Sequence, residues 1–278
     1  MINVGQKNLM KVIKTVDFGV YLDGEDLGEV LLPKQYLPDD CQLNDELEVF
    51  LYHDSEDRLI ATTETPKAVV GECAALKVIQ VNRVGAFLDW GLPKDLLVPY
   101  CEQVIPMKVD DTYVVYLFID EHSGRITASS QLDKFLPEKN LYRKAGQAVE
   151  IQIWAKTDLG YKAVIAGSTL GLLFKNEVFR PLRIGQVLPA YIKSIRDDGK
   201  IDLSLQPAGS QANHRQELSL QIIDHLKAND GKSPLTDKSL PDDIYAIYHV
   251  SKGSYKKALG ALYKQRKIII TKDAISLA

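Results

Sequence analysis

Aromatic rings and basic side chains recur at fixed distances from three glycines of this 278-residue chain. The three groups are Phe18, Gly19 and Tyr21; Val84, Gly85 and Phe87; and Leu159, Gly160 and Lys162, where Tyr161 supplies a ring one position early. A basic residue follows each glycine after 39 or 40 positions, at Arg58, Arg125 and Lys200. Exposed rings can stack on unpaired nucleobases, and cations can hold phosphates. The pattern is therefore typical of a binding surface for a polyanion with flat bases.

The residue types that would support catalysis are scattered instead. The five histidines show no HExxH spacing, and the chain contains neither a GxSxG phrase nor a GxxxxGK loop. The three cysteines, Cys41, Cys73 and Cys101, stand far apart, which argues against a disulfide framework and a thiolate metal site. We therefore expect no enzymatic activity, no cofactor and no metal ion.

Three copies of one unit position these residues. Each copy places a first glycine 14 residues before the second, as Gly5, Gly71 and Gly146 show. Each copy also places Asn44, Asp110 or Gly185 25 residues after the second glycine, preceded by an apolar residue. Positions whose spacing recurs in three successive segments indicate a duplicated supersecondary unit with one shared fold.

Each copy reads as five short strands. In the first copy, alternating and β-branched segments predict strands over Leu9–Val16, Val20–Leu22, Glu29–Leu32, Leu47–Tyr52 and Leu59–Thr62. Five strands in roughly 65 residues are typical of the oligonucleotide-binding (OB) barrel. The fold class is therefore multidomain and mostly β, with three tandem five-stranded barrels over residues 1–64, 67–132 and 145–206.

The pattern becomes helical after a stretch, Pro207–Asn213, whose composition predicts a linker. Residues 215–228, a segment opening near Pro241, and residues 251–267 predict three helices, and two short strands close the chain. Three helices and a β-hairpin predict a small α+β winged-helix domain over 213–278. Its third helix carries four lysines at Lys252, Lys256, Lys257 and Lys264.

The repeats resemble the S1 RNA-binding domain, whose strand phrase has an aromatic residue, a glycine, and a second aromatic two positions later. The whole chain resembles the bacterial conserved virulence factor B family, in which three such barrels precede a winged helix. The phrases that carry this resemblance are GAFLDWGLPKDLLVP, GLLFKNEVF, RDDGKIDLSLQ, DKSLPDDI and SKGSYKKALGALYK. The resemblance implies an RNA-binding protein with a regulatory role and no chemistry of its own.

Charged residues are distributed unevenly along the chain. Residues 1–142 hold 13 Lys and Arg against 24 Asp and Glu, a net charge of −11. Residues 143–206 hold 10 against 6, and residues 213–278 hold 11 against 7, so each of these segments carries +4. Because phosphate neutralisation supplies most non-specific affinity, this asymmetry favours the back half as the binding region. The acidic front half is then a spacer or a docking surface for a protein partner.

We therefore expect single-stranded RNA to bind mainly on the third barrel and the winged helix. The site residues predicted there are Tyr161, Lys162, Phe174, Lys175, Lys193, Arg196, Lys200, Lys252, Tyr255, Lys256, Lys257 and Lys264. Secondary candidates are Phe18, Tyr21, Arg58, Phe87 and Arg125. The alternative is a DNA-binding transcriptional regulator that acts through the winged helix. The first residues lack a signal-peptide pattern and no apolar run is long enough to span a membrane, so we expect a cytoplasmic protein without a membrane partner.

Overall fold

The computed structural model describes residues 2–139, 142–178, 181–207, 210–248, 250–271 and 273–278. The chain divides into two compact units, residues 1–137 and 138–278, which are described separately. Among the described residues, no helix combines the length and the apolar character needed to cross a bilayer.

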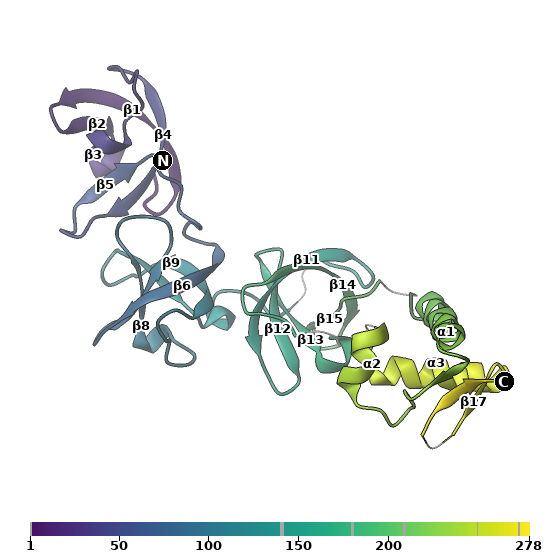
Figure 1. Cartoon of the computed structure of the whole chain (residues 1–278). Coiled ribbons are helices and arrows are strands. Elements are labelled where there is room, and N and C mark those ends of the chain that lie inside the picture. Colours follow the sequence, from purple (N-terminus) through teal and green to yellow (C-terminus); the bar gives the residue numbers. More distant parts are fainter. Residues whose placement is uncertain (1, 140–141, 179–180, 208–209, 249, 272) are drawn as a thin grey trace. The chain divides into compact units, whose positions relative to one another are not determined.

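The first barrel is closed, with the strand order β1-β2-β3-β5-β4. Its strands are β1 (Lys7–Val16), β2 (Gly19–Asp23), β3 (Glu29–Pro33), β4 (Glu46–His53) and β5 (Leu59–Thr62) (Figure 1). β3 and β5 pair in parallel, and every other pair is antiparallel. Alternation along β1 sends Met10 and Val12 into the interior, so the outward residues remain available for binding.

The second and third repeats keep this plan. The second comprises β6 (Cys73–Val81), β7 (Gly85–Asp89), β8 (Leu96–Pro99), β9 (Thr112–Ile119) and β10 (Ile126–Ser129), in the sheet order β10-β9-β6-β7-β8. Its edge strands β8 and β10 lie together without a ladder, so this barrel is nearly closed. The third, a closed barrel, comprises β11 (Ala148–Lys156), β12 (Gly160–Ile165), β13 (Thr169–Phe174), β14 (Val187–Ile195) and β15 (Ile201–Ser204). Short 3-10 turns lie at Glu25–Leu27, Lys34–Tyr36, Tyr100–Glu102, Leu132–Lys134 and Lys175–Glu177.

The repeated glycine has a steric reason. Gly19, Gly85 and Gly160 open the second strand of each barrel with φ of +156°, +159° and +154°. A Cβ atom on any of them would collide with the backbone of the third strand, which passes directly over the glycine. The glycine therefore fixes where the second strand starts, and with it which of the following side chains point outward.

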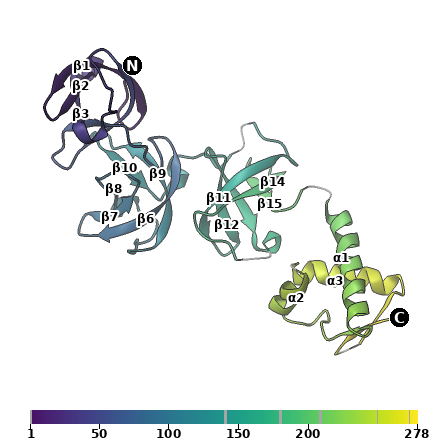
Figure 2. The ribbon, with the colours of Figure 1, turned by 45° about the horizontal axis from the view of Figure 1, so that its top comes forward.

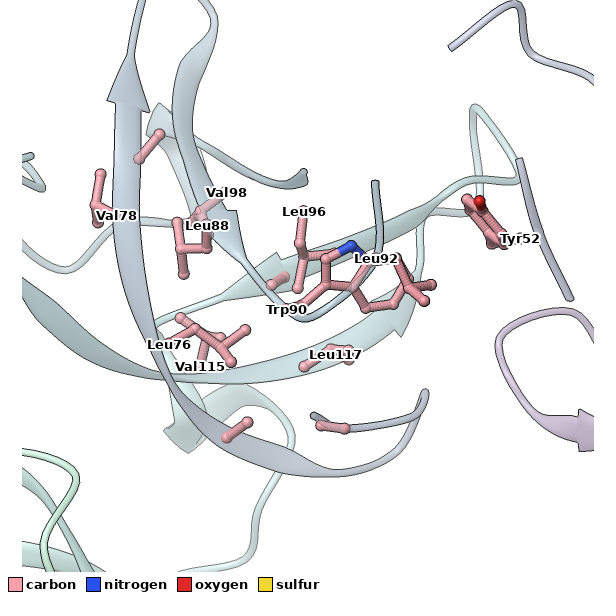
Figure 3. Close-up of a cluster of buried hydrophobic side chains, with 14 of the residues drawn as sticks. Tyr52, Leu76, Val78, Leu88, Trp90, Leu92, Leu96, Val98, Val115 and Leu117 are labelled. Atoms are coloured by element: carbon pink, nitrogen blue, oxygen red, sulfur yellow. The ribbon is translucent and has the colours of Figure 1, made fainter. Parts of the chain in front are cut away.

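Barrels 1 and 2 share one hydrophobic cluster (Figure 3). Trp90, only 2% exposed, lies among Leu92, Leu96 and Leu117. Its ring meets Phe50 and Tyr52 of barrel 1 edge-on, with centroids 5.7 and 6.4 Å away. These aromatic contacts fix the two barrels against each other by core-like packing.

The C-terminal domain is a winged helix. It comprises α1 (Ser210–Ala228), β16 (Lys232–Ser233), α2 (Pro241–Tyr248), α3 (Lys252–Lys264), β17 (Ile268–Ile270) and β18 (Ile275–Leu277), with the sheet order β16-β18-β17. α1 packs across α3 (Figure 2). α1 begins at Ser210, inside the stretch 207–213 that the composition predicted as a linker. The linker prediction was therefore too long, because the helix-breaking Pro207 and Gly209 both precede Ser210.

Candidate nucleic-acid interface

Barrel 1 presents the most exposed ring among the predicted site residues. Phe18 lies in the turn between β1 and β2 and is 58% exposed. The half-buried ring of Tyr21 meets it edge-on, with centroids 6.5 Å apart and ring planes at 83°. Tyr21 faces outward because it stands two positions after Gly19, and strand residues two apart share a face. The two rings therefore form a small platform on the outer side of β2.

Lys14 and the backbone of Lys34 border this platform. The Nζ of Lys14 lies 5.4 Å from the centre of the Tyr21 ring, since Lys14 and Tyr21 are paired across β1 and β2. Lys34 follows β3, and its backbone N–H donates to the carbonyl of Phe18 at 2.9 Å. Within the described part of the chain, neither lysine has a carboxylate at ion-pair distance. Both ammonium groups are therefore available to an anionic ligand.

The basic residues that end the first two motifs are engaged within the protein. Arg58 pairs with Asp54 at 2.7 Å and with Glu56 at 2.9 Å, so it braces the turn between β4 and β5. Arg125 pairs with Asp57 at 2.8 Å, across the junction of barrels 1 and 2. The predicted phosphate contacts of these two arginines would require breaking ion pairs that the fold uses.

Barrel 2 does not repeat the platform. Phe87 is half-buried on β7, and the position that corresponds to Phe18 is occupied by Val84, which is 49% exposed. An aliphatic side chain offers no flat face to a base. Phe87 therefore stands without the second ring that barrel 1 supplies at the equivalent position.

The stacking role predicted for Tyr161 in barrel 3 is wrong. The side chain is 8% exposed and belongs to the barrel's hydrophobic core. Tyr161 stands one position after Gly160, whereas Tyr21 stands two positions after Gly19. A displacement of one residue along a strand reverses the face, so this ring points inward and Lys162 points outward.

Two other rings of barrel 3 do meet cations. The guanidinium of Arg196 lies 5.4 Å from the centre of the half-exposed Phe174 ring. The ammonium of Lys162 lies 5.1 Å from the centre of the Trp154 ring, which is 8% exposed. Lys175, directly after β13, is exposed. The structure thus brings together part of the predicted set on the outer face of β12 and β13.

Most cations of that set are already paired with carboxylates. Lys193 contacts Glu177 at 2.6 Å, and Arg196 contacts Asp202 at 2.7 Å. The carboxylate of Glu138 meets Lys200 at 2.7 Å and Lys162 at 3.8 Å. The net charge of this segment therefore overstates the positive charge that its surface offers to a ligand.

The predicted site role of Tyr255 on α3 is also wrong. Its ring is fully buried in the winged-helix core, and its hydroxyl donates to the Leu235 carbonyl at 2.9 Å. Tyr255 shares a helix face with Leu259 and Leu262, at the spacing i, i+4, i+7 that covers the core.

The lysines of α3 fall into two groups. Lys256 and Lys257 in the middle of the helix and Lys264 at its end are exposed. Lys256 lies 3.7 Å from Asp237, while Lys257 and Lys264 have no ion-pair partner among the described residues. Lys252 instead donates to the Lys238 carbonyl at 3.1 Å, and Ser251 caps the helix by accepting from the Ser254 N–H. Two lysines of α3 are thus free to meet phosphates.

Four residues of these surfaces, Lys14, Lys34, Trp154 and Glu138, were not selected from the sequence. Lys14 is one of several alternating polar residues on β1, and Glu138 lies outside the three barrels that the sequence predicts. A usable signal existed for Trp154, because it occupies the repeat position of Ile13 and Ile79, both of which lie exposed.

Three OB-type barrels followed by a winged helix define a protein assembled from modules of nucleic-acid-binding types. Family models agree: residues 4–64 match the "S1 domain" and residues 220–277 match the "CvfB-like winged helix domain". The first of these matches falls on the barrel that carries the Phe18 and Tyr21 platform.

Relatives span nearly the whole chain. The uncharacterized protein YitL of Bacillus subtilis is 30% identical over 281 residues, and the alignment covers 95% of this chain and 90% of YitL. Conserved virulence factor B of Staphylococcus aureus (strain USA300) is 29% identical over 293 residues, and the alignment covers 99% of this chain and 94% of the relative. The S. epidermidis protein of that name is 29% identical over 248 residues, covering 86% and 82%. The chain belongs to the conserved virulence factor B family.

One solved structure is similar over the full length. It is a crystal structure from Streptococcus pneumoniae described as a multidomain protein with nucleic acid binding domains. Its sequence is 26% identical, and the alignment covers 99% of this chain and 98% of that one with a TM-score of 0.44.

Proposed function

We propose that this protein binds single-stranded RNA without chemical turnover and acts in the cytoplasm as a post-transcriptional regulator. The observation that supports this most is the platform of Phe18 and Tyr21 on barrel 1, bordered by the ammonium of Lys14 and by the backbone of the exposed Lys34. Among the described residues, it is the one pair of predicted rings that combines an exposed ring with a neighbouring cation that has no carboxylate partner.

The platform suits unpaired bases. Bases inside a duplex are covered by their neighbours, whereas a single strand can place a base flat on an exposed ring. Each such stack contributes about 1 to 3 kcal/mol and does not depend on base identity. Because residues 1–142 carry a net charge of −11, stacking rather than phosphate neutralisation must supply most of the affinity at this site.

The winged helix supplies the second contact. Lys257 and Lys264 on α3 offer ammonium groups that no carboxylate in the described part of the chain neutralises. Contacts of this kind hold the phosphate backbone and carry no sequence information. The principal ring contact thus moves from barrel 3, where the sequence placed it, to barrel 1, while the predicted role of the winged helix is retained.

A competition experiment on the full-length protein tests this proposal. A fluorescein-labelled oligouridylate of about ten nucleotides is bound first, and unlabelled single-stranded RNA or duplex DNA of equal length is then added. Single-stranded RNA should displace the probe at a lower concentration than duplex DNA. Equal displacement by both, or no binding of the probe at moderate salt, would contradict the proposal.

The second candidate is a DNA-binding regulator. The capped α3 with its exposed lysines favours it, because a winged helix can place such a helix in the major groove. This candidate predicts that duplex DNA displaces the probe more readily than RNA does. It also predicts that the loss of Phe18 leaves the affinity for the duplex unchanged.

A further inference from the structure

Barrel 3 contains a cavity on the side where OB barrels receive oligonucleotides. Its volume is about 460 Å³. The walls come from the turn before β12 (Thr157–Leu159), from β12 and β13, and from the turn before β15, which carries Arg196 and Lys200. The two strands and the two turns are the elements with which OB barrels hold nucleic-acid strands.

A carboxylate from the preceding segment lies at this cavity. Glu138 lines it together with Lys162 and Lys200. One oxygen of Glu138 lies 2.7 Å from the Nζ of Lys200, and the other lies 3.8 Å from the Nζ of Lys162. The Lys200 ammonium keeps the pKa of Glu138 below its ordinary value, so this carboxylate is charged at neutral pH. The Glu138 carboxylate thus pairs with two cations from different elements, Lys162 of β12 and Lys200 of the turn before β15.

The backbone beside Glu138 is attached at the same place. Lys139 forms an isolated antiparallel bridge with Lys200. The side chain of Lys139 also covers Gly199, where an added Cβ would come within 3.4 Å of it. The bridge and this side-chain contact hold the backbone of the segment against the turn before β15, which delivers Lys200 to the cavity.

We propose that this cavity is an additional binding site for the phosphodiester backbone of single-stranded RNA, and that Glu138 occupies it as an internal substitute for a phosphate. RNA enters when a phosphate takes the place of the Glu138 carboxylate on Lys162 and Lys200. Phe174 does not line the cavity, but its ring lies 5.4 Å from the guanidinium of Arg196, which does, so a strand that reaches Arg196 passes close to a ring on which a base can stack. We call this displaceable Glu138 carboxylate the gate. The identity of the ligand rests on the proposed RNA binding, whereas the gate concerns barrel 3 alone.

Tethering sets the selectivity of such a gate. A carboxylate on a short connection competes at an effective concentration in the millimolar range. A mononucleotide that offers one phosphate competes poorly against it, while a strand held elsewhere on the protein presents its phosphates at a comparable local concentration. The gate therefore admits polynucleotides that other parts of the protein already hold.

The test compares full-length Glu138→Gln with the wild type. Glu150→Gln is the matched control, because Glu150 is exposed on β11, has no ion-pair partner among the described residues, and changes the net charge equally. Binding of the labelled oligouridylate is measured by anisotropy from 50 to 300 mM salt. A 4-thiouridine version of the same probe is crosslinked, and the barrel 3 peptides are analysed by mass spectrometry.

We expect Glu138→Gln to bind the probe about three- to fivefold more tightly, the range of a released surface ion pair. The slope of log K against log salt should steepen by about 0.7 for each freed lysine. Crosslinks should rise in peptides of β12 and β13, Glu150→Gln should behave as wild type, and adding Lys200→Ala should cancel the gain. Unchanged affinity and crosslinking in Glu138→Gln would overturn the gate and reduce Glu138 to a structural brace.

The result also separates the two proposals. If the wild type binds the probe and Glu138→Gln binds it no better, the gate is wrong and the proposed function stands. If only Glu138→Gln binds the probe, the gate stands and the binding assigned to barrel 1 is wrong. If neither protein binds it, both are wrong.

Discussion

Replacing Phe18 with alanine isolates the contribution of stacking on barrel 1. The ring is 58% exposed and touches Tyr21 edge-on, so its removal takes away a surface for one base without opening the barrel core. The loss of one stacked base corresponds to about 1 to 3 kcal/mol, or roughly a 5- to 150-fold weaker affinity for single-stranded RNA. The assay is the anisotropy titration of the full-length protein with the labelled oligouridylate.

Two controls make this outcome specific. Leu43→Ala removes another exposed apolar side chain of barrel 1, 55% exposed and outside the platform, and should leave the affinity unchanged. Phe18→Tyr keeps a flat ring and should retain most of the binding. Because no charge is lost, the salt slope of Phe18→Ala should equal that of the wild type. An affinity within twofold of the wild type, with an unchanged melting temperature, would refute the stacking role of Phe18.

Three further changes give separate readouts. Replacing Lys257 and Lys264 with alanine should reduce the salt slope by about 0.7 for each phosphate that is no longer neutralised, and an unchanged slope would exclude both lysines from the interface. Trp90→Ala should destabilise the junction of barrels 1 and 2 by about 3 to 5 kcal/mol in urea unfolding followed by circular dichroism; an unchanged midpoint would contradict the packing role of this ring. Arg125 lowers the pKa of Asp57 below its ordinary 3.8, so the stabilisation from this pair is present above that pH and is lost as the pH falls through the lower, folded-state pKa. Asp57→Asn should therefore lose less stability on acidification than the wild type does, and parallel stability curves would contradict this.

The barrels could be predicted because their signals are local and repeated. The glycine that opens each second strand is required by a neighbouring strand passing over it, and the same constraint appears three times in the sequence. The alternation of buried and exposed residues along β1 and the buried stripe of α3 are likewise visible in the sequence, because apolar residues recur there at the period of a strand or a helix. Errors arose where a boundary depended on one or two residues, as at the start of α1.

The site was harder to predict because exposure and pairing depend on the folded chain. The ring of Tyr161 differs from that of Tyr21 by a single position, and that position decides whether a ring faces the core or the solvent. The net charge of each segment indicated where lysines and arginines are concentrated, but it did not show which carboxylates pair with them. Glu138 lies outside the predicted third barrel, yet its carboxylate occupies two of that barrel's cations.

A crosslinking map of RNA on the intact wild-type protein tests the placement of the interface most directly. With 4-thiouridine oligonucleotides and peptide mass spectrometry, we expect the strongest crosslinks at Phe18 and Tyr21, weaker ones along α3, and few on β12 and β13 while Glu138 is present. Crosslinks concentrated on barrel 3 or barrel 2, with none at Phe18 or Tyr21, would contradict the assignment of RNA binding to the aromatic face of barrel 1.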